Sequence, residues 1–214
     1  VQASDADPSA LTTLMVGESV AAPTAPAGPS AEAEDALVLS DLRVNDSRGL
    51  PAARGVSLAV RAGEVFGIAG VDGNGQVELM DALAGVRMPE SGGVLLDGAD
   101  ITRASPRERA KRGLAIVTDD RRQKDLSVGL SIAENLATKR YRDAPIARAG
   151  WLLPRAMATA AEHARSEYDI RADDVSAPVS RLSGGNQQKV VIARELSHAG
   201  TALVAMNPTR GLDV

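Results

Sequence analysis

Two glycine-rich segments of this chain contain the residue types that bind phosphate. The first is GVDGNGQV, residues 70–77, and the second is LSGGNQQK, residues 182–189. Glycine lets a backbone come close to an anion, and a helix that begins there directs free N–H groups and its positive dipole end towards it. Taken singly, each segment is also explained by a glycine turn before an ordinary helix.

The first segment keeps the backbone of a phosphate-binding loop and loses its side-chain chemistry. In a loop of the type G-x-x-x-x-G-K-[S/T], the Lys neutralises phosphate and the hydroxyl ligates Mg²⁺. Gln76 and Val77 stand in those two places. Gln76 can donate a hydrogen bond but carries no charge, and Val77 has no atom that ligates a metal. The backbone positions that are kept are Gly70, Gly73, Asn74 and Gly75.

A third segment, NPTRGLD at residues 207–213, follows the second by about twenty residues. The pair resembles the signature motif and the D-loop of ATP-binding-cassette (ABC) ATPases, and the resemblance covers roughly residues 37–214. The Asn-Gln-Gln-Lys tail resembles the branch that powers import of simple sugars and nucleosides. The resemblance assigns the signature motif to Leu182, Ser183, Gly184, Gly185, Asn186, Gln187 and Gln188, and the D-loop to Gly211, Leu212 and Asp213.

The acidic residues that ABC ATPases use for hydrolysis are replaced. The family normally has Asp-Glu-Pro-Thr after a buried strand, where Asp supports Mg²⁺ and Glu polarises the attacking water. Met206 and Asn207 occupy those two positions. A thioether is a poor ligand for a hard cation, and Asn cannot accept the proton of a water. Losing a general base lowers a rate by about 10²–10⁴-fold. We therefore predict that this cassette does not hydrolyse ATP with its own glycine loop.

The resemblance implies that a cassette with an inactive loop still has a role when it pairs with a second cassette. ABC modules pair face to face, and each ATP lies between the P-loop of one module and the signature motif of the other. The expected role is therefore to complete the ATP and Mg²⁺ site of a partner cassette, with no metal site in this chain. In two-cassette importers the partner is the N-terminal cassette of the same chain. The combination of GVDGNGQ with a replaced acidic pair most resembles the nucleoside-importer branch.

Further partners and one further site residue follow from the same resemblance. We expect transmembrane permease subunits, an extracytoplasmic binding protein acting indirectly, and a peripheral location at the cytoplasmic face of the cell membrane. Asp119 stands where the family has its Q-loop glutamine, which couples nucleotide to the membrane subunit. A solvated acidic turn is the alternative explanation of Asp119.

The elements that must position these residues follow from apolar periodicity. Residues 65–69 (VFGIA) are predicted as a short buried strand that leads into the glycine loop, and residues 76–84 as a helix that Gly85 ends. Residues 114–117 and 202–205 are predicted as further core strands. Apolar residues between 37 and 60 indicate a strand-rich N-terminal layer.

The region from about 120 to 195 has helical signals. Ser131 and Glu134 have the spacing of a capping box, and Pro154 has the position of a first helical residue. By resemblance, this region is the helical subdomain that ABC ATPases insert into their core. We therefore expect an α/β fold, namely a P-loop NTPase of the ABC nucleotide-binding type, truncated at its C-terminus.

Composition restricts the class of protein and indicates its segments. The 214 residues are 44% hydrophobic, the formal charge is −4 without a basic stretch, and there is no Cys. These values favour one globular domain, give no reason to expect nucleic-acid binding, and exclude thiolate metal sites. Residues 21–36, rich in Pro and Ala, are predicted to be a linker before the ABC domain at 37–214.

Residues 1–20 and the function leave alternatives open. Residues 11–20 (LTTLMVGESV) resemble the tail of a preceding ABC module, and a short N-terminal arm explains them equally well. Because the sequence starts at Val1 and stops at Val214 just after a predicted strand and loop, we expect a fragment of a longer polypeptide. The alternatives to an importer subunit are a non-transport ABC protein and a structural pseudo-ATPase half that binds no nucleotide.

Overall fold

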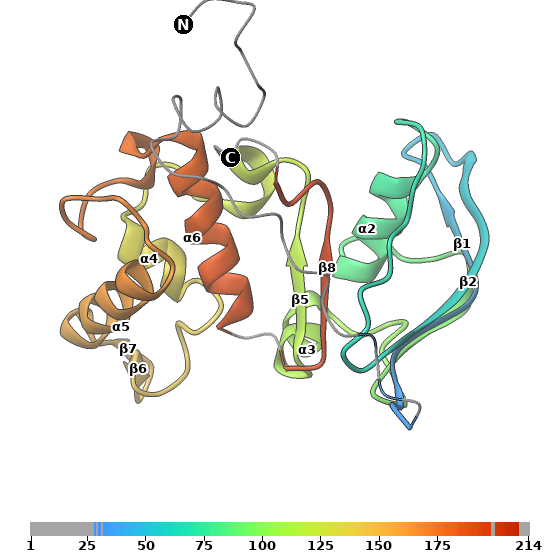
Figure 1. Ribbon diagram of the computed structural model, residues 1–214, viewed down its shortest axis with the longest axis horizontal. Coiled ribbons are helices and arrows are strands. Elements are labelled where there is room, and N and C mark those ends of the chain that lie inside the picture. Colours follow the sequence, from blue (N-terminus) through green and yellow to red (C-terminus); the bar gives the residue numbers. More distant parts are fainter. Residues whose placement is uncertain (1–27, 29, 31, 198–199, 210–214) are drawn as a thin grey trace, which may run out of the picture.

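The computed structural model describes residues 28, 30, 32–197 and 200–209. Figure 1 shows an antiparallel sheet with helix α2 on one side of the molecule, a pair of strands in the middle and a group of helices on the other side. The predicted tail at residues 1–20 and the predicted D-loop residues 211–213 lie outside the described residues.

The antiparallel sheet confirms the predicted strand-rich N-terminal layer. Its strands are β1 (Asp35–Asn45), β2 (Pro51–Arg61), β3 (Ser91–Leu96) and β4 (Ala99–Asp100), in the order β2-β1-β3-β4. The inward residues of β1 are apolar and buried, because alternate side chains of a strand point to the same face. They are Leu37, Leu39, Leu42 and Val44, and the register shifts between Leu39 and Leu42.

Helix α2 packs on this sheet and has the predicted bounds, Gln76–Ala84. Gly85 ends it in the left-handed conformation, with φ of 75°, which glycine adopts without strain. The buried residues Leu79, Ala82 and Leu83 join the core of the sheet. A short helix, α3 (Pro106–Lys111), follows β4, and its N-terminus has a complete capping box between Ser105 and Glu108.

The central pair consists of β5 (Leu114–Val117) and β8 (Ala202–Ala205), which confirms both predicted core strands. They pair in parallel, with Leu114 opposite Ala202. Because both strands end at the same edge, Asp119 and Met206 emerge at the same side of the fold. The amide of Met206 continues the ladder and donates to the carbonyl of Val117 at 2.9 Å.

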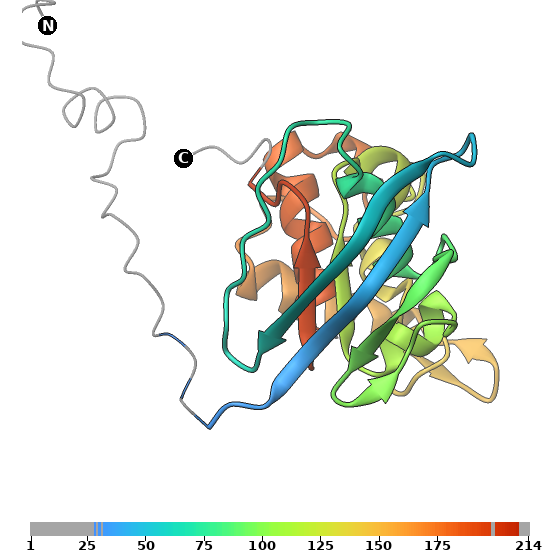
Figure 2. The same ribbon diagram turned by 90° about the vertical axis from the view of Figure 1, so that its right-hand side faces the viewer.

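The predicted strand at residues 65–69 is wrong. The structure has no strand there, and Val65, Phe66 and Ile68 are 80%, 46% and 56% exposed. Figure 2 shows the connection from β2 to α2 as a coil. An apolar run becomes a strand only where a neighbouring backbone accepts its hydrogen bonds, and a pocket of about 750 Å³ lies between residues 66–70 and β2.

The helical group is formed by residues 121–197. It contains a π-helical turn (Arg121–Asp125), α4 (Ile132–Ala137), the hairpin β6–β7 (Ala147–Arg148 and Trp151–Leu152), α5 (Pro154–Glu167), a 3₁₀ turn (Val179–Arg181) and α6 (Gly184–Leu196). The predicted capping box of Ser131 and Glu134 and the helix that begins at Pro154 are confirmed. None of the helices in the described part of the chain combines the length and apolarity that crossing a bilayer requires.

Candidate functional site

The glycine loop before α2 has a backbone that only glycine can adopt at one point. Gly75, the residue before the helix, has φ of 97°, and Gly73 has φ of 85°. A Cβ on Gly75 would lie 2.6 Å from the carbonyl oxygen of Ala52 on β2. The loop is therefore held against β2 by a close backbone approach, and α2 begins directly from it.

Gln76 folds back across this loop. Its Nε2 donates to the carbonyl of Val71 at 3.0 Å, and a Cβ built on Gly70 would lie 2.1 Å from the same nitrogen. The side chain that stands in the place of a phosphate-binding Lys is thus bonded to its own loop. It provides an uncharged amide that closes the loop.

One pocket of about 460 Å³ brings several of the predicted site residues together. Gly70, Asp72 and Gln76 line it from the loop, Asp119 from the segment after β5, and Met206 and Asn207 from the end of β8. The carboxylate of Asp119 lies 3.3 Å from the ammonium of Lys124. The loop, residue 119 and residues 206–207 therefore meet at one place.

The side chains of this pocket lack the usual oxygen ligands at two places. Met206 has a thioether at the end of β8, and of the two carboxylates that line the pocket, Asp72 and Asp119, the second is paired with Lys124. Across residues 32–197 and 200–209, no three His, Asp or Glu side chains converge as a metal site requires. The neutral Gln76 amide, already bonded to Val71, adds no positive charge for a phosphate.

The predicted signature motif stands at the N-terminus of α6. Ser183 caps the helix, and its Oγ accepts from the amide of Asn186 at 3.4 Å. The first bond within the helix runs from the amide of Gln187 to the carbonyl of Ser183, at 2.9 Å. The amides of Gly184 and Gly185 therefore precede the helical ladder and point out of the helix end, beside the exposed Ser183.

The two glycine-rich segments do not meet within one copy of the chain. In Figure 1, α2 and α6 lie on opposite sides of the β5–β8 pair. The residues that line the 460 Å³ pocket come from the loop, α2, β8 and Asp119, and none comes from α6. The exposed N-terminus of α6 therefore lies apart from the chain's own glycine loop, with the β5–β8 pair between them.

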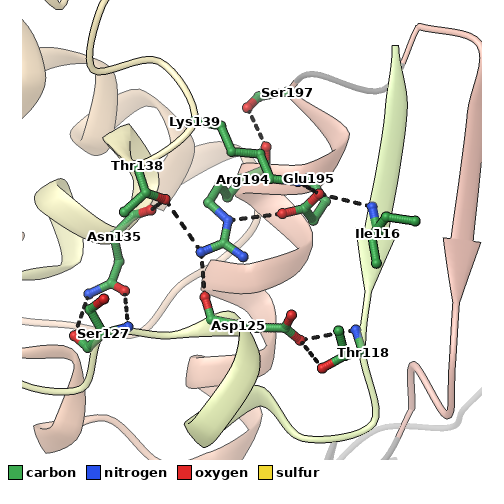
Figure 3. Close-up of polar contacts among 10 residues, drawn as sticks. All are labelled: Ile116, Thr118, Asp125, Ser127, Asn135, Thr138, Lys139, Arg194, Glu195 and Ser197. Atoms are coloured by element: carbon green, nitrogen blue, oxygen red, sulfur yellow. Dashed lines mark hydrogen bonds and ion pairs between the residues drawn. The ribbon is translucent and has the colours of Figure 1, made fainter. Parts of the chain in front are cut away.

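Sequence reasoning missed the network that anchors the other end of α6. The fully buried Glu195 accepts from the amide of Ile116 on β5 at 3.0 Å and pairs with Lys139 and with Arg194 (Figure 3). Arg194 also donates to the carbonyl of Asp125. The signal in the sequence is the Arg-Glu pair inside the apolar run VVIAREL, because charges within a buried helix face need partners.

Asp125 joins this network to the end of β5. Its carboxylate accepts from the amide and the hydroxyl of Thr118, each at 3.1 Å. Burial raises the pKa of Asp125, and the bonds from Thr118 and the charge of Arg194 oppose that rise in part. The C-terminal end of α6 is thus tied to the strand that leads to Asp119 at the pocket.

Curated import proteins are similar to this chain. The nucleoside import ATP-binding protein NupA of Lactococcus lactis is 40% identical over 95% of the chain and 40% of its own length. The guanosine import ATP-binding protein NupO of Bacillus subtilis is 40% identical over 98% of the chain and 41% of its own length. The chain therefore spans about two fifths of these relatives.

Solved ABC structures have the same fold. The structure of cbiO1 from Clostridium perfringens, part of the ABC transporter complex cbiONQ, has a TM-score of 0.62 and 26% identity, covering 84% of this chain and 68% of that one. A dimeric ATP-binding cassette bound to ADP and Pi has a TM-score of 0.66 and 24% identity, covering 83% and 76%. The second likeness shows the fold alone.

The sequence profile described as ABC transporter matches residues 53–210, from near the start of β2 to the segment after β8. The match includes the glycine loop, Asp119, the signature motif and residues 206–207. Together with the fold, this places the α/β domain among the P-loop NTPases of the ABC type. The chain belongs to the ABC transporter family.

Proposed function

We propose that this chain is part of the ATP-binding subunit of an importer for nucleosides or simple sugars, and that it contributes its signature motif to the ATP site of a second cassette. The observation that carries the proposal is an asymmetry. The N-terminus of α6 has an exposed Ser183 and outward amides, whereas the chain's own loop has Gln76 bonded to Val71. The similarity to nucleoside and ribose import proteins supports the class of transported molecule.

In this proposal the residues of α6 act on a nucleotide held by the opposing cassette. The hydroxyl of Ser183 donates to the terminal phosphate, and the amides of Gly184 and Gly185 add two donors together with the positive end of the helix dipole. Preorganised donors of this kind stabilise the charge that develops during phosphoryl transfer. The opposing cassette supplies the P-loop lysine, the Mg²⁺ ligands and the general base.

The proposed architecture extends beyond the described residues. The partner cassette precedes this domain in the same polypeptide, residues 21–36 link the two, and residues 120–195 form the helical subdomain. Transmembrane permease subunits bind the domain at the cytoplasmic side of the membrane. Asp119, which lines the 460 Å³ pocket, couples nucleotide binding to them. An extracytoplasmic binding protein delivers the substrate to the permease.

The test compares two variants in the full-length protein assembled with its permease subunits. Gly184→Asp is expected to remove most ATP turnover, because a carboxylate there repels the phosphate and blocks the close backbone approach. Gln76→Ala is expected to lower turnover only modestly, because its loop is unproductive. Thermal unfolding of both variants serves as the control for folding. If Gln76→Ala is as damaging as Gly184→Asp, the asymmetric assignment is wrong.

A further inference from the structure

The Asn-Gln-Gln-Lys tail ties the start of α6 to the chain that precedes it. Asn186 Oδ1 accepts from the amide of Arg171 at 2.7 Å, in the segment that follows α5. Lys189 binds the same segment, with its ammonium 2.7 Å from the carbonyl and 2.8 Å from the carboxylate of Asp169. Gln187, which is buried, donates to the carbonyls of Val179 and Leu182. The first turn of α6 is therefore held on several sides.

Asn186 does more than hold the helix, because it also donates to Ser183. Its Nδ2 lies 3.0 Å from Ser183 Oγ, in addition to its amide nitrogen at 3.4 Å. A hydroxyl has two acceptor lone pairs and one hydrogen to donate. With N–H groups at both acceptor positions, the hydrogen of Ser183 points away from Asn186, towards the exposed side of the motif.

The orientation of the Asn186 amide is set by the backbone of Arg171. The backbone amide of Arg171 donates a hydrogen bond, and only the oxygen of the Asn side chain can accept it. Oδ1 must therefore face Arg171. Nδ2 then has to face Ser183, at the distance given above. The three groups form one directed chain, from the Arg171 amide through the Asn186 side chain to the Ser183 hydroxyl.

We infer that Asn186 is a positioning residue that makes Ser183 a hydrogen-bond donor towards a phosphate oxygen. The inference rests on the proposed function, in which that phosphate belongs to a nucleotide on the opposing cassette. A serine without this partner can turn its hydrogen inward and present a lone pair, which repels an anion. Asn186 removes that alternative before the nucleotide arrives, so no reorientation is needed during the reaction.

The main variant is Asn186→Asp in the full-length protein assembled with its permease subunits. Its shape is nearly the same, and one carboxylate oxygen can still accept from Arg171. The other oxygen has no hydrogen to donate and instead accepts the Ser183 hydroxyl, turning it inward. We expect kcat for ATP to fall by about 10²-fold, the order found for losing one preorganised donor, with KM changed far less.

A double substitution separates positioning from folding. If Asn186 acts through Ser183, then Asn186→Asp lowers turnover far less in the Ser183→Ala background than in the wild type. In the Ser183→Ala background only the repulsion between the new charge and the phosphate remains. A purely structural role predicts the same fold-loss from Asn186→Asp in both backgrounds. Asp169→Asn is the matched control, since it weakens the Lys189 tie to the same segment without touching Ser183, and Asn tolerates the positive φ of residue 169.

A second measurement does not depend on turnover. Amide hydrogen exchange at Arg171 reports whether the bond to residue 186 is present. Protection is expected to persist in Asn186→Asp and Ser183→Ala and to be lost in Asn186→Ala, where no acceptor remains. Loss of protection in Asn186→Asp would assign its effect to a loosened segment and overturn the inference.

The outcomes distinguish this inference from the proposed function. If Ser183→Ala and Gly184→Asp both leave turnover near the wild-type rate, the signature motif has no role in hydrolysis and the proposed function fails. If these two variants abolish turnover while Asn186→Asp has the wild-type rate, or lowers it equally in both backgrounds, the proposed function stands and the positioning role of Asn186 is wrong.

Discussion

The carboxylate of Glu195 accepts a hydrogen bond from the backbone amide of Ile116 at 3.0 Å, which joins the C-terminal end of α6 to the middle of β5. The carboxylate is fully buried, and its other partners are the cations of Lys139 and Arg194. One buried anion thus holds two cations and a main-chain donor from separate elements. Its removal leaves all three without their shared acceptor.

Glu195→Ala is therefore expected to lower the free energy of unfolding by about 3–5 kcal/mol, the range for breaking a buried ion pair from one side. Urea denaturation of the purified protein measures the change. Glu162→Ala is the control, because Glu162 pairs with Arg165 on the surface and such pairs contribute at most about 1 kcal/mol. Equal losses in the two variants would show that the buried network does not stabilise the fold.

Asp125→Asn tests the pH dependence of the same network. Burial raises the pKa of Asp125 in the folded state above that of the unfolded chain, so its contribution to stability is full at low pH and is lost as pH rises through the folded pKa. Asn keeps an oxygen acceptor for Thr118 and does not ionise. The melting temperature of the variant minus that of the wild type should therefore increase from pH 4 to pH 7.

The control for this experiment is Asp173→Asn, which removes one negative charge from an exposed position. The difference in melting temperature between Asp173→Asn and the wild type should vary less with pH than the difference between Asp125→Asn and the wild type. If the melting temperature of Asp125→Asn minus that of the wild type stays constant or falls as pH rises, the pKa of Asp125 is not raised in the folded protein.

Asn135→Asp probes a fully buried amide that fixes the start of α4. Asn135 Nδ2 donates to the carbonyls of Ser127, Leu130 and Ser131, and Oδ1 accepts from the amide of Ser127 at 2.9 Å. A carboxylate places negative charge against these carbonyls, so we expect a loss of at least about 1–3 kcal/mol in unfolding free energy. Gln123→Glu, on the surface, should have little effect in the same urea titration.

The 214-residue chain alone should show no Mg²⁺-dependent ATPase activity above background. The reason is that Gln76, Val77, Met206 and Asn207 replace a cation, a hydroxyl and two carboxylates. Phosphate release from the pure chain at about 1 s⁻¹, the low end for enzymes, would refute this. Restoring the four residues should leave activity weak, because an opposing signature motif is still required.

The elements that were predicted correctly are those specified by neighbouring residues. Gly75 and Gly85 bracket α2, and the Ser131–Glu134 capping box starts α4, so local patterns were sufficient there. The segment at 65–69 has the composition of a strand but lacks the pairing that makes one, and pairing partners are not encoded in a five-residue window. The distinction between strand and exposed coil is decided by tertiary structure.

The residues of the candidate site were identified one motif at a time. The structure brings the glycine loop, Asp119 and the pair Met206–Asn207 into the lining of one pocket. The contacts of Glu195 with Ile116 and of Asn186 with Arg171 span 79 and 15 residues of sequence. Such contacts depend on how helices pack, so motif spacing does not reveal them.

The bond between Arg171 and Asn186 has a consequence for how sequences of this family diverge. Asn186 contacts a main-chain amide, so the side chain at position 171 is free to vary without weakening the bond. Only proline, which has no amide hydrogen, is excluded there. The two positions should therefore show no correlated substitutions among homologues, and covariation analysis would miss the contact that joins this segment to Asn186.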